Sequence, residues 1–119
     1  MLVDTSVWVD HLRQNEPVLA LLLERLEVEC HPFIVGELAL GSMQQRSEIL
    51  TLLHSLPQLH IATHDEVLAF VDRHKLAGSG IGWVDAHLLA SAAINHTVLW
   101  TKDKRLSNVA EALSLRAHP

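Results

Sequence analysis

The sequence predicts a single α/β domain built on a short, mainly parallel sheet of roughly five strands. Short apolar runs alternate with segments whose apolar residues recur at helical spacing, a pattern typical of a parallel sheet with helices on both faces. The length of 119 residues fits one domain, so we expect one unit over residues 1–119. The single cysteine excludes an internal disulfide framework, and 49% apolar residues suffice for a core without one.

The first half of the chain alternates strands and helices. The expected elements are strands at 1–3 and 28–30 and helices at 17–26, 33–40 and 44–53. Pro17 suits the first turn of a helix, and Gly41 suits the end of one. Ser42 and Gln45 have the spacing of a capping box, which predicts the start of the third helix.

The second half continues the alternation. The expected elements are strands at 59–62, 98–101 and 114–117 and helices at 63–74, 83–94 and 103–110. Thr63 and Glu66 form a second capping-box pattern. Three of the five glycines lie in Gly78–Gly82, which we interpret as a flexible loop because it lacks the spacing of a phosphate-binding fingerprint.

Composition restricts the possible functions. The net charge of −5 and pI near 5.9 argue against a protein that holds nucleic acid on a basic surface. Aromatic residues make up only 4%, which argues against a base-stacking platform. The chain start lacks a signal-peptide pattern, and the longest aliphatic run, Val18–Leu23, is too short to span a bilayer, so we expect a cytoplasmic protein without membrane association. The mean hydropathy of +0.20 fits either a partner-covered apolar surface or a large core.

Two acidic residues directly follow expected strands. Asp4 follows the strand at 1–3, and Asp103 follows the strand at 98–101. Ligands of open parallel sheets bind outside the carboxyl ends of the strands, so both acids are candidate site residues. Each also has a simpler explanation, because Asp is a preferred helix N-cap.

Two further acids lie on apolar helical stripes. The residues three and four positions from Glu37 and from Asp85 are apolar or glycine, so both side chains are expected to face inward. A buried unpaired carboxylate is costly and must pair, take up a proton or bind a cation. Asp65 meets the same criterion, but the first turn of its helix suits a carboxylate because of the helix dipole. Asp85 also lies near a helix start, which leaves Glu37 as the clearest candidate.

These four acids have no basic residue on the same stripes. Carboxylate oxygens are preferred ligands of Mg²⁺ and Mn²⁺, and such ions bind phosphate oxygens and activate water. A bound cation would also allow an acidic protein to accept a polyanion. We therefore expect a hard-cation site for phosphoryl chemistry, formed by Asp4, Glu37, Asp85 and Asp103.

Four segments resemble the motifs of PIN-domain ribonucleases, in particular the VapC toxins of VapBC toxin–antitoxin pairs. The segments are LVDTSVW at 2–8, GELALG at 36–41, GWVDAHLLA at 82–90 and LWTKD at 99–103. They occur in the order of the family, extend over nearly the whole chain and match it at every acidic position.

The resemblance implies a three-layer α/β/α fold in which the first and fourth strands are neighbours. It also implies an endoribonuclease dependent on Mg²⁺ or Mn²⁺, in which an activated water attacks the phosphodiester in line. Asp4, Glu37 and Asp85 would then hold the metal, directly or through water, with Asp103 as the fourth member. The hydroxyls that would orient these carboxylates belong to Thr5, Ser6 and Thr101.

The resemblance further implies an RNA substrate and a VapB-like antitoxin, with a homodimer of this chain inside a larger assembly. Our candidates for the covered surfaces are the Leu19–Leu26 and Gln44–Leu53 helices, which carry leucines beyond what one core face needs. The alternative is that these leucines fill a leucine-rich core.

Other functions fit the sequence less well. A receiver-type phosphoacceptor domain needs an acceptor Asp after its third strand, and Asp65 is better explained as a helix-start acid. A haloacid-dehalogenase-type phosphatase needs Asp where Ser6 stands. An inactive PIN-fold interaction module is an alternative that the four acids argue against.

The histidines, the tryptophans and the basic residues beside Asp103 have simple interpretations. The nine histidines lack zinc-site spacing, and we expect most of them at the surface. We expect the three tryptophans to pack in the core rather than stack on bases. Lys102, Lys104 and Arg105 flank Asp103 and either contact phosphate or are solvated at a helix start.

Overall fold

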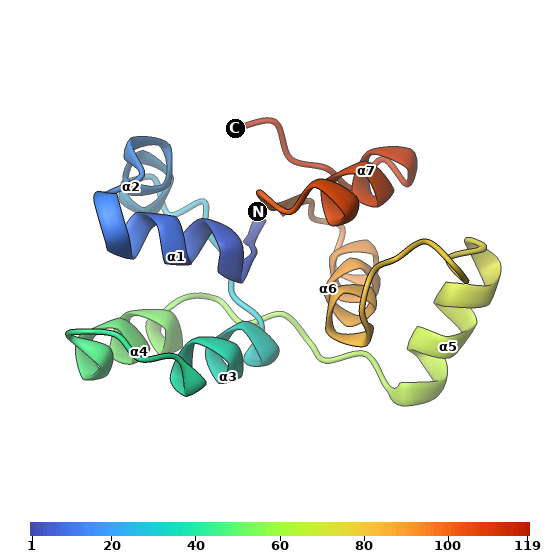
Figure 1. Ribbon diagram of the computed structural model, residues 1–119, viewed down its shortest axis with the longest axis horizontal. Helices are drawn as coiled ribbons and strands as arrows, with labels where there is room; N and C mark the ends of the chain where they lie inside the picture. The colour runs from blue at the N-terminus through green and yellow to red at the C-terminus, as the bar shows by residue number, and fades with distance from the viewer.

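The computed structural model describes residues 1–119 as seven helices and two strands (Figure 1). The strands are β1 (Leu2–Val3) and β2 (Leu99–Trp100). The helices are α1 (Thr5–Gln14), α2 (Pro17–Glu24), α3 (Pro32–Leu40), α4 (Arg46–Ser55), α5 (His64–Arg73), α6 (Trp83–Ile94) and α7 (Lys104–Ala112). None of the helices has the length and apolar character that crossing a membrane requires.

The two strands pair in parallel, which confirms the predicted α/β class with a parallel sheet. Leu2 lies opposite Leu99, and Val3 lies opposite Trp100. Single parallel bridges continue this pairing on both sides, between Leu2 and Glu29, Cys30 and Gln58, and Leu99 and Arg116. The prediction of roughly five strands is therefore wrong, because the three outer segments form bridges and not strands. Next to one of them, Pro32 already begins α3, which leaves no room for a longer strand after Cys30.

Helix α1 is an element that the sequence patterns missed. It fills the interval between the first strand and Asn15, and buries only Val7 and Trp8. Polar residues occupy most of its other positions, so the apolar periodicity is weak. The omission matters for function, because α1 forms one wall of a groove that contains Glu37.

One predicted helix start is confirmed and one is wrong. At α5, the Thr63 amide donates to Glu66 Oε1 at 2.8 Å and the Glu66 amide donates to Thr63 Oγ1 at 3.1 Å, the reciprocal bonds of a capping box. At α4, the cap is Gln45 with a positive φ of 58° and no side-chain cap bond, so Ser42 does not start a capping box.

Helices pack around the paired strands in pairs. Figure 1 shows α3 beside α4 and α5 beside α6. The buried core joins β1, β2 and the inner faces of the helices through side chains such as Leu2, Trp8, Leu88 and Leu99. Beyond the paired residues, the Asp4 amide donates to the Trp100 carbonyl at 2.9 Å. The ends of β1 and β2 therefore lie side by side, and they bring Asp4 next to Thr101.

Candidate active site

Asp4 is clamped by two hydroxyls at the end of the strand pair. Its carboxylate is 7% exposed, and Oδ2 accepts hydrogen bonds from Ser6 Oγ and Thr101 Oγ1, each at 2.8 Å. Asp4 begins α1 as its N-cap residue, yet its side chain makes no cap bond. The carboxylate is thus turned away from the helix amides, so the N-cap explanation does not account for its position.

Asp103 does act as a helix cap. Its Oδ1 accepts a hydrogen bond from the Leu106 amide at 2.8 Å at the start of α7. Its own amide donates to Thr101 Oγ1 at 3.0 Å, so the hydroxyl that donates to Asp4 also fixes the backbone of Asp103. Oδ2 of Asp103 has no hydrogen-bond partner within the protein. One oxygen therefore caps the helix, and the other is available to a ligand.

Glu37 lies at the rim of the site and is exposed, so the expectation that it faces inward is wrong. Helix α3 instead turns Ile34 and Leu38 into the core. The Glu37 carboxylate accepts one hydrogen bond, from Thr5 Oγ1 at 2.9 Å. This contact crosses from α3 to α1 and orients Glu37 through one of the hydroxyls for which the sequence predicted such a role.

Asp85 lies half-buried in the first turn of α6. Burial is the main cause that raises its pKa, and the negative charges of Asp4, Asp103 and Glu37 raise it further. One long hydrogen bond from the Gly82 amide, at 3.4 Å, acts in the opposite direction. The other three carboxylates are therefore close enough for their charges to act on Asp85.

No cation of the protein neutralises this group. None of the four acids takes part in an ion pair. Lys102, next to Asp103 in sequence, points elsewhere: its Nζ lies 3.0 Å from Asp10 and 2.8 Å from Glu16. These carboxylates raise the pKa of Lys102. The lysine is thus committed to structural ion pairs, a partnership that the sequence did not reveal.

The acids are near one another but do not form a closed cage. No three His, Cys, Asp or Glu side chains stand close enough together to hold a metal ion as they are placed. Of the four acids, Glu37 lines the groove described next.

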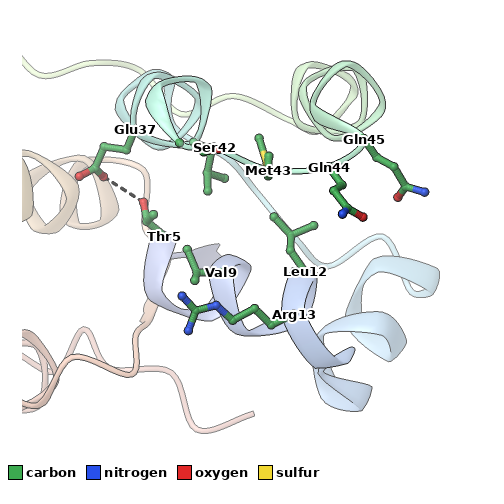
Figure 2. A pocket seen from close by; sticks show the side chains of 11 residues that line it. Thr5, Val9, Leu12, Arg13, Glu37, Ser42, Met43, Gln44 and Gln45 are labelled. Carbon is green, nitrogen blue, oxygen red and sulfur yellow. Dashed lines mark hydrogen bonds between the residues drawn. The ribbon is translucent and has the colours of Figure 1, made fainter.

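A groove of about 510 Å³ extends from Glu37 between α1 and the connection from α3 to α4. Figure 2 shows Glu37 and Thr5 joined by their hydrogen bond at one end, and Gln44 and Gln45 at the other. The apolar side chains along it are Val9, Leu12, Leu38 and Met43. Arg13 and polar side chains make up most of the rest of the lining, so the groove combines apolar and polar walls and reaches one of the acids.

A buried histidine ties the two acid-bearing helices together. The Phe33 amide donates to His31 Nδ1 at 2.9 Å at the start of α3, and His31 Nε2 lies 3.1 Å from Ser91 Oγ of α6. Ser91 Oγ in turn donates to the His60 carbonyl at 2.9 Å. Burial, with a smaller effect of His87, lowers the pKa of His31 to about 4, so the ring is neutral and its Nε2–H donates to Ser91.

Most histidines are at the surface, as expected, but His31 and His87 are buried. Among the tryptophans, Trp8 packs in the core and Trp83 is exposed, so the expectation of core packing is wrong for Trp83. Asp65, the acid that a receiver domain would use, is exposed at the capped start of α5, and no strand forms at 59–62. The structure does not favour the receiver alternative.

Comparison with known proteins agrees with these features. The model of the PIN domain family matches residues 1–112. Two curated relatives, both named Ribonuclease VapC32 and from the CDC 1551 and H37Rv strains of Mycobacterium tuberculosis, are each 52% identical over 107 residues. These residues are 89% of this chain and 86% of each relative. The chain belongs to the PIN-domain family and is a VapC-type member of it.

Proposed function

We propose that this protein is a metal-dependent endoribonuclease that hydrolyses RNA phosphodiester bonds, and that it is the toxin of a toxin–antitoxin pair acting in the cytoplasm. The observation that carries the proposal is a group of four carboxylates, none of them in an ion pair, in which the charges of three act on the fourth, Asp85. Such a group repels itself and an RNA backbone alike. A divalent cation would relieve both repulsions. The family membership and the ribonuclease relatives support the same activity.

The donor chemistry favours Mg²⁺ or Mn²⁺. All four side chains offer carboxylate oxygens, and neither a cysteine nor a histidine completes the group. In our proposal Asp4, Glu37 and Asp85 hold the metal, directly or through water, and Asp103 contributes its uncapped oxygen. In our proposal the exposed Glu37 side chain, which a single hydrogen bond holds, moves toward the cation when it binds.

A bound divalent cation would supply a Lewis acid that activates water and stabilises charge on the cleaved phosphate. The chain's own residues do the positioning. Ser6 and Thr101 hold the Asp4 carboxylate in one orientation, and Thr101 also fixes the Asp103 backbone. Thr5 performs the same role for Glu37 across the gap between α1 and α3. These hydroxyls would keep the site ordered when RNA enters it.

The pairing pattern also supports the three-layer α/β/α arrangement of the family, which we propose for this chain. Parallel contacts follow the order of segments 58, 29–30, β1, β2 and 116. This order makes the first and fourth segments neighbours, as the resemblance implied.

We further propose that a VapB-like antitoxin covers the groove and the outer face of α2. Val18 and Leu21 of α2 are 37% and 44% exposed, while Leu19 and Leu22 of the same helix fill the core. The groove beside α1 offers four apolar side chains among polar ones and reaches Glu37. An amphipathic segment lying there would cover apolar surface and obstruct the acids. Self-association as a homodimer would use the remaining exposed leucines. The mass in solution, with and without the neighbouring gene product, tests both contacts: a monomer that ignores this product contradicts them.

RNA cleavage by the purified, partner-free protein tests the nuclease proposal. We expect cleavage of total cellular RNA in Mg²⁺ or Mn²⁺ and none in EDTA. Glu37→Gln should abolish cleavage. Asp65→Asn is the matched control, because it removes an exposed carboxylate outside the group and should leave cleavage unchanged. Full activity in EDTA would reject the metal-dependent mechanism.

A further inference from the structure

Aromatic rings from three helices form a continuous row. Trp83, the first residue of α6, is 41% exposed. Its ring centroid lies 5.1 Å from that of His64 on α5 and 5.1 Å from that of His87. The His87 ring in turn contacts Phe33 of α3 edge-on, with centroids 4.8 Å apart. The row runs from the half-buried Phe33 to the exposed rings of Trp83 and His64.

This row follows the two helices that carry Glu37 and Asp85. Trp83 and Asp85 share the first turn of α6. Phe33 and Glu37 lie four residues apart on α3 and therefore on one face of that helix. The row therefore begins at the same end of α6 as Asp85 and shares a face of α3 with Glu37.

A hollow of about 240 Å³ lies against Trp83, between α5, the glycine loop and α6. Its lining contains no charged side chain and consists of Val71, Leu76, Ala77, Gly78, Ile81, Gly82, Trp83 and Ala86. An uncharged hollow with an exposed indole on its wall suits a flat, weakly polar base better than a phosphate.

A cation without an ion-pair partner lies against the glycine loop. A Cβ built on Gly80 would lie 2.9 Å from a guanidinium nitrogen of Arg105, so the arginine rests against the loop backbone three residues before Trp83. Gly80 has a positive φ of 87°, which favours glycine at this contact. Unlike Lys102, Arg105 is in no ion pair, so its charge is available to a phosphate.

We propose that Trp83 and the adjoining hollow form a nucleobase subsite, in which one base of single-stranded RNA stacks on the indole while Arg105 contacts a neighbouring phosphate. This inference rests on the proposed ribonuclease function and adds a specificity-determining residue to it. The low aromatic content argues against a platform for several bases, but a single exposed ring is enough for one.

Three variants separate stacking from general effects. Trp83→Leu removes the ring and keeps an apolar side chain, and should lower kcat/KM on a random-sequence single-stranded RNA pool by about 5- to 150-fold, the range of base–aromatic stacking. Trp83→Phe retains a ring and should keep most of the activity. Ile94→Ala is the matched control, because Ile94 is 49% exposed at the other end of α6 and should leave kcat/KM unchanged.

Tryptophan fluorescence supplies a readout that does not depend on cleavage. We expect the four nucleoside 5′-monophosphates, tested singly, to quench the wild-type emission, with at least one of them clearly effective. Ribose 5-phosphate, which carries the phosphate without a base, should quench weakly. Trp83→Phe should lose the base-dependent quenching, because the two tryptophans that remain are the fully buried Trp8 and the partly buried Trp100 of β2.

The possible outcomes distinguish a failure of the subsite proposal from a failure of the proposed ribonuclease function. A wild-type protein that cuts RNA, together with Trp83→Leu of unchanged kcat/KM, would overturn the subsite and leave the nuclease intact. Equal quenching by ribose 5-phosphate and by nucleotides would also overturn it. A wild-type protein that neither binds nor cuts RNA would overturn the proposed function and the subsite together.

Discussion

The strand-end half of the candidate site and its helical half hold their acids in different ways. At the strand ends, Asp4 accepts two short hydrogen bonds from hydroxyls, and Asp103 caps a helix. On the helices, Glu37 accepts one bond from Thr5, and Asp85 accepts one long bond from the Gly82 amide. The first pair is built into the fold, and the second pair is held loosely.

This difference separates the contribution that an acid makes to stability from the contribution that it makes to activity. Carboxylates at the strand ends are tied into the fold and, in our proposal, also hold the ion, so their loss should affect both stability and activity. Glu37 and Asp85 are placed by their helices, which the buried bond between His31 and Ser91 ties together from behind. Their loss should remove activity with little cost in stability. The predictions below test this contrast, ordered by the expected change in the free energy of unfolding.

Asp4→Asn should damage both properties. The substitution replaces the charged acceptor of Ser6 and Thr101, and weakening two charge-assisted hydrogen bonds costs about 3 kcal/mol of unfolding free energy. Cleavage should fall by about a hundredfold or more, because a metal ligand is lost. Urea unfolding and RNA cleavage measure the two effects. An Asp4→Asn protein as stable as the wild type would show that the strand-end half is not built into the fold.

Low pH should weaken the buried contact of His31 that joins the helices carrying Glu37 and Asp85. The pKa of His31 is lowered from 6.5 to about 4, so the folded state binds this proton less readily than the unfolded state does. His31 therefore contributes stability above pH 6.5 that is lost as the pH falls toward 4, up to about 3 kcal/mol. Protonation would also place a hydrogen on Nδ1, where the Phe33 amide now donates.

His31→Asn isolates this effect. Asparagine is a good N-cap and does not ionise in this range, so the variant should be less stable at pH 7 but should lose less stability between pH 6.5 and 4. Urea unfolding across this range gives both curves. Parallel curves for the wild type and the variant would exclude His31 as the source of the pH dependence.

Two identical substitutions compare the halves directly. Thr101→Val removes a buried hydroxyl that bonds both Asp4 and Asp103, and should cost about 2 kcal/mol. Thr5→Val removes the hydroxyl that bonds the exposed Glu37, and should change stability by less than about 0.5 kcal/mol. Thermal or urea unfolding measures both. Equal losses of unfolding free energy in the two variants would contradict the proposed difference between the two halves of the site.

Glu37→Gln should have the smallest effect on stability. It removes one negative charge from a crowded group, which relieves repulsion. The amide oxygen still accepts the bond from Thr5. Without metal, the melting temperature should stay level or rise slightly. A severely destabilised variant would instead make Glu37 a structural member of the fold.

The parts of the fold that depend on local signals could be predicted from the sequence. Thr63 and Glu66 lie three residues apart, and their reciprocal bonds formed as expected. The family resemblance implied that the first and fourth strands are neighbours, and β1 pairs with β2 in this way. The order of the four acidic motifs along the chain was sufficient to identify the family.

The missed features depend on contacts between distant residues. The bond of His31 to Ser91 joins positions 60 apart, and that of Lys102 to Glu16 joins positions 86 apart. Neither pair has a local pattern that points to the other member. The exposure of Glu37 was missed because apolar neighbours along α3 do not reveal which edge of the helix faces α1. The groove could not be predicted without α1, whose apolar pattern is weak.

The most direct test of the central claim is the binding of Mn²⁺ to the partner-free protein, followed by electron paramagnetic resonance. If the four acids form one hard-cation site, the wild type should bind Mn²⁺ with saturation, and Glu37→Gln and Asp85→Asn should each weaken that binding by at least about tenfold. Asp65→Asn should bind as the wild type does, because Asp65 lies outside the group. Mn²⁺ binding that is unchanged in Glu37→Gln and Asp85→Asn would contradict the claim.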